Sequence, residues 1–516
     1  MDGSGAGKST SYVFPNAFQL LGSYVFTDPK GEVYDRTAGY LKEQGYDIKV
    51  LNLVDPSLSD GYNPLMHINS EIDVDVIANT IVKGQKSNDA KADPYWDDMS
   101  EMLLKALIYY LIATRPEEEQ NLASCAELVR AANNNGGDNL LTDLISVLPY
   151  DHPARMFYKS IEIAPEKTYS SILSSLQSKL GKFDSKEIAE LTSTDTIDFD
   201  AIGTKKTAVY VISSDTHTAY DFLLTIFFSQ MIQRLYDFAD KNGGALDMPT
   251  YFILDEFANI GRVPDFDKKI STSRSRKISF SVILQNLDQL EAVYDKSYET
   301  IIGNCDTHLF LGSNSQKTVE YFSKALGEKT ISKDNVSRNR DRENRRNGMT
   351  LSDQIMARAL LTPDEMRRLD TDLCIIYEKG IKPVKARKYY HFEHKICEIA
   401  KRFEISHNAI GQIDRGIWRK FNPYNPYVEE SEKSSSPLNI ESLDDIFGDE
   451  EKAEKEEKVP ISANDTPLDI SSIGDLDNDE PSPKTEEVKS DDPFSYDIQK
   501  ELEAKFDELF GTNDDE

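Results

Sequence analysis

The chain has 516 residues, of which 39% are hydrophobic, and a formal net charge of −31. This length is enough for roughly three to four domains with sizeable cores. Cys125, Cys305, Cys374 and Cys397 lie far apart and without metal-ligand spacing, which predicts reduced core thiols and argues against a disulfide framework or a zinc site. No apolar run approaches the roughly 18 residues that span a bilayer, so the sequence as given predicts a soluble chain.

The negative charge is unevenly distributed along the chain. Residues 430–516 hold 29 Asp and Glu against 8 Lys and Arg, whereas all the residues before them hold 61 against 51. The strong acidity therefore belongs to a C-terminal segment, and the rest of the chain is only mildly acidic. Without a global basic field, any contact with DNA has to come from local patches or from a pore.

A phosphate-binding loop opens the chain. Residues 3–9 match the end of a G-x-x-x-x-G-K-[ST] motif, in which backbone amides surround phosphate oxygens, a lysine reaches the β- and γ-phosphates and a hydroxyl holds Mg²⁺. The residues expected to bind the nucleotide are Gly3, Gly5, Gly7, Lys8 and Ser9. Taken alone, the glycines also fit an ordinary flexible N-terminus, so the loop needs support from the rest of the chain.

The loop lacks its first half. Asp2 stands where the first glycine of the motif is expected and would put a carboxylate near the triphosphate, an unfavourable contact between like charges. The buried strand that normally precedes such a loop has no residues here to form it. We expect that Met1 is not the natural start or that the gene is truncated, which the DNA upstream would decide.

Secondary-structure signals divide the rest of the chain. Strands and helices alternate over residues 1–72, helical periodicity replaces strands over residues 73–200, and strands return over residues 201–425. The expected strands are at 23–27, 48–53, 207–212, 251–254, 280–285, 308–311 and 373–377. This order predicts an α/β fold with a mostly parallel sheet and an inserted all-α domain.

Polar residues follow two of the expected strands. Asp255 and Glu256 end the apolar run 251–254 in the Walker B form, in which Asp255 holds Mg²⁺ and Glu256 activates the attacking water. Gln285 ends the next strand and can sense the γ-phosphate, because ligands collect beyond the carboxyl ends of parallel strands. Each feature alone also fits a solvated strand end. The acidic pair and the glycine loop together predict an ATP and Mg²⁺ site.

Two basic stretches have open interpretations. In residues 271–277, Arg274 is either an arginine finger that reaches a phosphate in a neighbouring subunit or a solvated surface residue. Residues 333–346 form an expected polar loop, whose arginines either face a phosphate backbone or are solvated, with interspersed acids diluting their charge.

The C-terminal segment, residues 426–516, is rich in Ser, Asp, Glu, Lys and Pro and predicts a disordered acidic tail. Apolar residues at helical spacing near 494–511 indicate a short amphipathic helix that docks on a partner, although isolated apolar residues among charges are the plainer interpretation.

The motifs converge on a known family. In addition to the glycine loop, the chain carries 27-TDPKGE-32, 63-NPL-65, 93-DPYW-96, 254-LDEFANIG-261, 285-QNLDQL-290 and 361-LTPDEMR-367. In this order they resemble the type IV coupling proteins of bacterial conjugation, the TraG/TraD group, over residues 2–390. The acidic tail falls outside the resemblance. The membrane-anchoring helices that normally precede the motor in this family are absent from the given sequence.

The resemblance implies a RecA-like P-loop ATPase that forms a homo-hexamer on the cytoplasmic side of the bacterial cell membrane. Such a motor couples relaxase-bound DNA, or a protein substrate, to a type IV secretion channel, and the helical insertion meets the DNA or the relaxase. By position, Lys8 and Ser9 match the phosphate and Mg²⁺ ligands, Gln285 the sensing glutamine, and Arg274 the arginine at the subunit interface. Two alternatives remain open: an FtsK/HerA-like DNA pump with another cargo, and an inactive truncated remnant that acts as an adaptor.

Overall fold

The computed structural model describes residues 7–83, 94–133, 140–214, 220–339 and 348–424. Gly3, Gly5 and Asp2 lie outside these residues, as do the predicted acidic tail and its amphipathic helix near 494–511.

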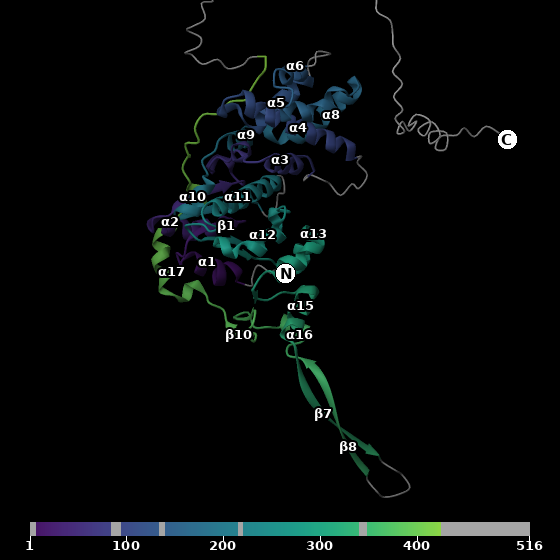
Figure 1. Cartoon of the computed structure of the whole chain (residues 1–516). Helices are drawn as coiled ribbons and strands as arrows, with labels where there is room; N and C mark the ends of the chain where they lie inside the picture. The colour runs from purple at the N-terminus through teal and green to yellow at the C-terminus, as the bar shows by residue number, and fades with distance from the viewer. Residues whose placement is uncertain (1–6, 84–93, 134–139, 215–219, 340–347, 425–516) are drawn as a thin grey trace, which may run out of the picture. The chain divides into compact units, whose positions relative to one another are not determined.

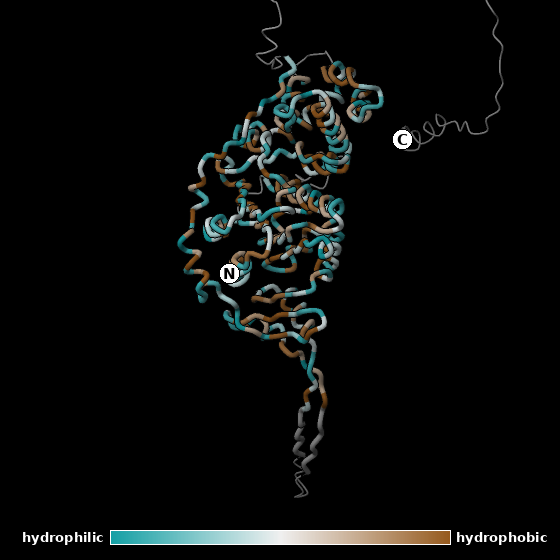
Figure 2. Tube along the Cα trace, turned by 60° about the vertical axis from the view of Figure 1, so that its left-hand side comes forward, coloured by the Kyte–Doolittle hydropathy of each residue, from teal (hydrophilic) through white to brown (hydrophobic). Residues whose placement is uncertain are grey.

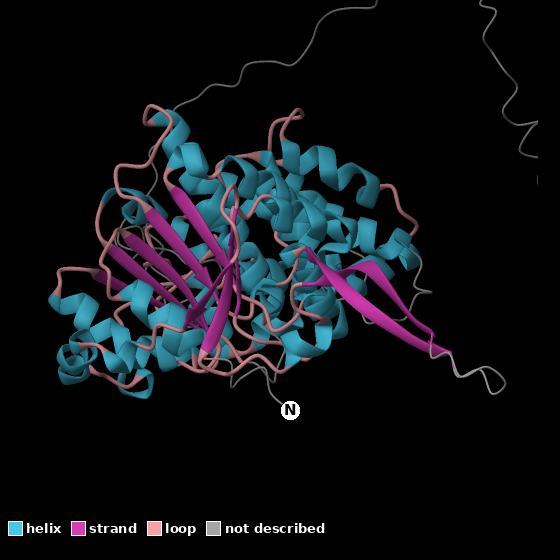
Figure 3. Ribbon diagram, turned by 90° about the horizontal axis from the view of Figure 1, so that it is seen from below, coloured by secondary structure: helices cyan, strands magenta, loops and turns pink. Residues whose placement is uncertain are grey.

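A five-stranded sheet forms the centre of the fold. Its strands are β1 (Ser23–Asp28), β2 (Asp47–Asn52), β3 (Thr207–Ile212), β4 (Thr250–Leu254) and β5 (Ile278–Val282). They lie in the order β2-β3-β1-β4-β5, and every neighbouring pair is parallel. Figure 3 shows these strands side by side with helices around them. The predicted α/β fold with a parallel sheet is confirmed.

Both faces of this sheet are buried, because side chains alternate between them along each strand. Val25 and Phe252 belong to the face that packs on α11 (Asp221–Lys241) and on the helices of the insertion. Tyr24 and Phe26 belong to the other face. The elements covering that second face are α1 (Phe14–Ala17), α2 (Glu32–Glu43) and α17 (Lys395–Ala400). The sheet therefore forms the middle layer of three.

The segment between β2 and β3 is helical. Its helices are α3 (Glu71–Lys83), α4 (Pro94–Thr114), α5 (Leu122–Asn133), α6 (Leu140–Ser146), α7 (Pro153–Glu162), α8 (Glu166–Leu180), α9 (Lys186–Ser193) and α10 (Phe199–Thr204). The described residues between 53 and 206 include no strand. This confirms the predicted all-α insertion.

The helical insertion and the sheet share one hydrophobic core. Leu104 on α4 and Phe228 on α11 are fully buried members of the same cluster as Val25 and Phe252 of the sheet. Figure 2 shows apolar residues running through both parts. The insertion is thus continuous in packing with the sheet that carries the predicted nucleotide site.

The later strands form two further sheets. β6 (Thr307–Phe310), β9 (Leu373–Glu378) and β10 (Val384–Arg387) pair as a three-stranded antiparallel sheet. The helices that pack on them are α15 (Gln316–Leu326) and α16 (Pro363–Arg367). The helices α12 (Phe266–Thr272), α13 (Leu287–Tyr294) and α14 (Tyr298–Gly303) contribute to the core of the parallel sheet instead. The strands predicted at 308–311 and 373–377 therefore exist, but they pair with each other outside the parallel sheet.

A long hairpin includes the first half, residues 333–339, of the polar loop predicted at residues 333–346, and residues 340–346 lie outside the described residues. β7 (Glu328–Asn339) and β8 (Gly348–Ala359) pair in antiparallel register from Glu328 opposite Ala359 to Asn339 opposite Gly348. Figure 1 shows this hairpin extending beyond α15 and α16. The charged and polar residues at 333–339 indicated a loop, but their backbone pairs as a strand.

The last described residues, 395–424, form a strap that joins the sheet part to the helical insertion, and Figure 1 shows it along the outside of α2 and up to α5. It begins with α17 and three-residue 3₁₀ turns. The backbone amide of Ile405 donates to the Asp35 carbonyl on α2 (3.0 Å), and the amide of Phe421 donates to Ser124 Oγ on α5 (2.9 Å). We call residues 395–424 the C-terminal strap.

Candidate nucleotide site

The end of the glycine loop is the start of a helix. Gly7 has φ +72°, a left-handed conformation that suits glycine, and a Cβ there would lie 3.2 Å from Thr10 Oγ1. The Gly7 carbonyl accepts the amide of Ser11 (2.8 Å), and a wide π-helical stretch, Ser9–Val13, leads into α1. The first amides of a helix have no partner within it and form a natural binding site for phosphate.

Lys8 lies against the acidic pair that follows β4. Its ammonium is 3.0 Å from Glu256 Oε1 and 4.0 Å from Asp255 Oδ1, and these three side chains are only 11%, 17% and 11% exposed, respectively. Gln285, which follows β5, donates from Nε2 to the same Glu256 oxygen at 2.9 Å. The structure therefore brings together four predicted site residues from three separate segments, beyond the carboxyl ends of adjacent strands.

The charge balance of this cluster suits a nucleotide and its metal. Burial raises the pKa of Asp255, and Glu256 adds to that rise, whereas Lys8 and the Ser9 hydroxyl oppose it. A bound divalent cation would relieve the repulsion between the two carboxylates. Within the described residues no group of three or more His, Cys, Asp or Glu side chains is arranged for a metal. Mg²⁺ needs no such cage, because it binds through one or two protein oxygens, waters and substrate phosphates, and Ser9 and Asp255 fit that need.

The backbone turns sharply at the acidic pair. Glu256 has φ +53°, a left-handed conformation that is unusual for a residue other than glycine. Its amide donates to Asp255 Oδ1 (3.0 Å), and the next amide, that of Phe257, donates to the Ile283 carbonyl beyond β5 (3.1 Å). These bonds hold the turn, which directs the Glu256 side chain back toward Lys8.

Thr27 positions the acidic pair from the neighbouring strand, a role that we did not predict. At the end of β1 its hydroxyl donates to the Asp255 carbonyl oxygen at 2.6 Å, in a buried environment. The adjacent Asp28 is also buried and accepts the amide of Tyr34 at 2.8 Å, at the start of α2. Burial raises the pKa of Asp28 to about 6. The motif at residues 27–32 was visible in the sequence, but no pattern assigned these contacts.

Arg274 lies away from the Lys8 cluster. It is exposed in the short turn Arg274–Arg276, before the amino end of β5, whereas Gln285 follows the carboxyl end. The five residues of β5 separate the two ends by roughly 17 Å, more than a side chain covers. Its neighbour Arg276 is engaged in an ion pair with Asp240 at 2.8 Å. Arg274 therefore cannot serve the nucleotide site of its own chain.

An aromatic segment beside the loop was also missed. A Cβ on Gly7 would lie 3.3 Å from Tyr390 Cε1, so this tyrosine borders the loop directly. His391 donates from Nδ1 to the Thr10 carbonyl at 3.0 Å and packs edge-on against Phe14 of α1. Burial lowers the pKa of His391, which favours the neutral ring. The run 389-YYHF-392 was the available signal, but its distance of about 380 residues from the loop hid the contact.

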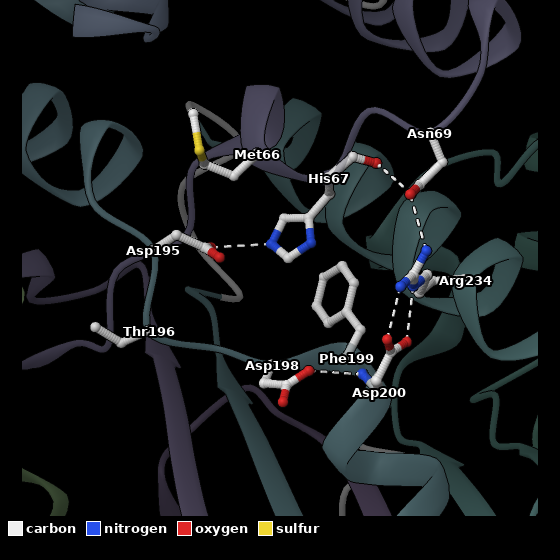
Figure 4. Close-up of a pocket in the computed structure, with 9 residues that line it drawn as sticks. All are labelled: Met66, His67, Asn69, Asp195, Thr196, Asp198, Phe199, Asp200 and Arg234. Carbon is white, nitrogen blue, oxygen red and sulfur yellow. Dashed lines mark hydrogen bonds and ion pairs between the residues drawn. The ribbon is translucent and has the colours of Figure 1, made fainter. Parts of the chain in front are cut away.

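A separate pocket of about 390 Å³ lies where the chain crosses between the sheet and the insertion (Figure 4). His67 Nε2 is 2.9 Å from Asp195 Oδ1, and Arg234 donates two hydrogen bonds to the Asp200 carboxylate at 2.7 and 2.6 Å. The His67–Asp195 pair joins the outgoing and returning segments of the insertion, and the Arg234–Asp200 pair joins the returning segment to α11. We regard the pocket as a junction and assign it no ligand.

Comparison with known proteins places the chain in a family. A family model described as type IV secretory system conjugative DNA transfer matches residues 1–412. The probable conjugal transfer protein TraG of Sinorhizobium fredii (strain NBRC 101917 / NGR234) is 24% identical over 410 residues, or 76% of this chain and 61% of that protein. Protein VirD4 of Agrobacterium fabrum (strain C58 / ATCC 33970) is 24% identical over 428 residues, or 78% and 60%. The chain thus spans about three fifths of the length of these relatives.

Solved structures of coupling proteins are also similar to this chain. The unbound monoclinic form of the bacterial conjugative coupling protein TrwBdeltaN70 has 15% identity and a TM-score of 0.48, and the match covers 72% of this chain and 85% of that one. TrwB in complex with ADP and Mg²⁺ has 15% identity and a TM-score of 0.47, with 72% and 86% covered. Within the residues that the structure describes, no helix is long and apolar enough to cross a membrane. Because the family model matches 412 of the 516 residues, the chain belongs to the type IV secretory system conjugative DNA transfer family.

Proposed function

We propose that this chain is the motor part of a conjugative coupling protein, which hydrolyses ATP to drive relaxase-bound DNA, or a protein substrate, to a type IV secretion channel. The observation that carries the proposal is the convergence of Lys8, Glu256 and Gln285 at the carboxyl edge of a parallel sheet, in a chain of the conjugative transfer family. Ligands of open α/β sheets bind at this edge.

Each residue of the proposed site has its own role in binding or hydrolysing the nucleotide. The amides of Gly3, Gly5 and Gly7 and the ammonium of Lys8 bind phosphates. Ser9 and Asp255 hold Mg²⁺, which neutralises charge on the phosphate oxygens. Glu256 orients the attacking water, and Gln285 holds Glu256 through the 2.9 Å hydrogen bond. A triphosphate would replace Glu256 as the partner of Lys8 and leave that carboxylate free for the water.

Arg274 acts in trans in this proposal. Its place before the amino end of β5 puts it out of reach of the site in its own chain, as an arginine finger supplied by a neighbour requires. A homo-hexamer in which each subunit lends Arg274 to the next would complete every site.

The other assignments follow from the family. Residues 1–72 and 201–425 would form the RecA-like nucleotide-binding domain, and residues 73–200 the inserted domain that meets DNA or the relaxase. The motor would lie on the cytoplasmic side of the bacterial cell membrane, beside the secretion channel.

The test is ATP hydrolysis by the purified chain, with and without single-stranded DNA. Lys8→Ala and Glu256→Gln should each lower the rate about 100-fold or more, because both remove groups that act on the reacting phosphate. Lys379→Ala serves as the matched control, since that lysine is 85% exposed, outside the cluster. A wild-type chain that shows no turnover at any protein concentration, with or without DNA, would contradict the proposal.

A further inference from the structure

A stacked pair of aromatic rings borders the phosphate loop. Tyr390 and Phe392 have ring centroids 5.1 Å apart and planes inclined by 18°. The Tyr390 ring reaches the loop, since a Cβ on Gly7 would lie 3.3 Å from its Cε1 atom. Phe392 is 56% exposed. An aromatic surface is therefore open to solvent directly beside the predicted phosphate site.

The pair is held in place from both sides. The Tyr390 hydroxyl donates to the Thr371 carbonyl and approaches Asp372 Oδ1, each at 3.3 Å. His391, which lies between these two residues in the sequence, is buried and donates to the Thr10 carbonyl at 3.0 Å. The rings are thus fixed relative to the helix that begins at Lys8, and they present a ready surface to a ligand bound there.

A nucleotide whose phosphates bind at this helix start has to place its base on a nearby surface. Exposed aromatic rings leave apolar area in water, a cost that stacking on a planar base removes. We propose that the Tyr390–Phe392 pair is the surface on which the base of the bound nucleotide stacks. This inference rests on the proposed function and adds residues that bind the base.

The chemistry of the surface defines the ligand class. Stacking needs only a flat π-system and discriminates little between bases. The Tyr390 hydroxyl already has partners, and the nearby Arg387 is paired with Glu393 at 3.0 Å, so the groups that could read a base edge are engaged elsewhere. We therefore expect nucleotides as a class, with ADP and GDP bound about equally.

The experiment compares a nucleotide with a ligand that has phosphates only. Titration calorimetry with Mg²⁺ present would measure the affinity of the full chain for ADP, GDP and inorganic tripolyphosphate. Tyr390→Leu and Phe392→Leu keep apolar bulk but remove the flat ring. Each substitution should weaken the affinity for ADP and GDP about tenfold, in the range of one stacking contact. The affinity for tripolyphosphate should stay unchanged. Tyr389→Leu is the control, because Tyr389 is 52% exposed and stacks instead on His394.

The possible outcomes distinguish this inference from the proposed function on which it rests. If the wild type and the two variants bind ADP equally well, the base does not stack on the Tyr390–Phe392 pair, and the proposed nucleotide site is unaffected. An equal loss of affinity for ADP and for tripolyphosphate would mean that the rings only support the phosphate loop, which also overturns the inference. A wild type that binds none of the ligands overturns both. Thermal melting of each variant shows whether a loss of affinity reflects a loss of folding.

Discussion

Asp28 is a buried carboxyl next to the nucleotide site, and its ionisation costs stability. It is 1% exposed, and burial raises its pKa from 3.8 to about 6, although the Tyr34 amide partly offsets this shift. Between pH 4 and pH 6 the native chain keeps a proton that the unfolded chain has lost. The free energy of unfolding therefore falls as the pH rises through this window, by about 2–3 kcal/mol, and stays lower above it.

Asp28→Asn should remove this pH dependence. The amide side chain keeps an oxygen that accepts the Tyr34 N–H, but it has no charge to bury. We expect the variant and the wild type to unfold alike near pH 4, and the variant to be more stable by about 2 kcal/mol above pH 6.5. Urea denaturation across the pH range measures the difference directly. A variant that is less stable at pH 7 would mean that the native protein stabilises the charged carboxylate.

The sequence predicted which residues meet at the site better than it predicted what holds them. Lys8, Glu256 and Gln285 follow recognisable motifs, so their proximity could be predicted, while their roles stay predictions. Thr27 and Tyr390 escaped notice because a hydroxyl that bonds a carbonyl, or a ring that borders a glycine, leaves no periodic pattern. Their contacts depend on chain crossings that only the folded arrangement reveals.

The C-terminal strap adds a second connection between the sheet part and the insertion, beside their shared core. On α2, Gly39 allows its close approach, since a Cβ there would lie 1.9 Å from the Phe403 carbonyl oxygen. Farther along, Arg415 donates from Nε to the Ser59 carbonyl at 2.7 Å. On the insertion, Phe421 is 3% exposed and lies under the Arg115 guanidinium, 4.3 Å from its ring centroid. Phe421 is the main apolar anchor at that end of the strap.

Phe421→Ala should release the end of the strap from the insertion. Truncating a buried phenylalanine typically costs about 3–5 kcal/mol, and local opening absorbs part of this cost. We expect trypsin to cleave at Arg415 and Arg419 at least about tenfold faster in the variant, because cleavage tracks the open population. Ile417→Ala is the matched control, since Ile417 is 76% exposed. Equal cleavage rates in Phe421→Ala and the wild type would show that other contacts hold the strap.

Regular elements were easier to predict than irregular ones. The strands at 207–212 and 251–254 are continuous apolar runs, as fully buried parallel strands require. The strap is as rich in apolar residues as the rest of the chain, but they follow no sustained helix or strand period, and its backbone bonds to distant groups. A polar loop was predicted at residues 333–346, and its first half, residues 333–339, belongs to the strand Glu328–Asn339 of the hairpin. Prediction failed where long-range backbone hydrogen bonds, and no regular apolar period, define the element.

At the scale of the whole molecule, the separation of Lys8 and Arg274 makes each chain incomplete as an ATPase in our proposal. The two residues lie at opposite ends of the strands of one sheet. A single chain would then supply the phosphate loop of one site and the finger of another.

Mixing two inactive variants tests this arrangement. Lys8→Ala and Arg274→Ala should each be nearly inactive alone. In mixed assemblies, a subunit with intact Lys8 meets a neighbour with intact Arg274, and an equal mixture should recover up to about a quarter of the wild-type rate if subunits assemble at random. ATP turnover of the mixture, after exchange of subunits, is the measurement. No recovery, although the variants assemble together, would place Arg274 outside the active site.

The strap also decides where the rest of the chain is attached. Its last described residue, Tyr424, donates its hydroxyl to the Ala131 carbonyl on α5, at 3.2 Å. The described residues therefore end beside α5 of the helical insertion. A pull on this end of the strap would act on the insertion, whose buried core is continuous with that of the parallel sheet.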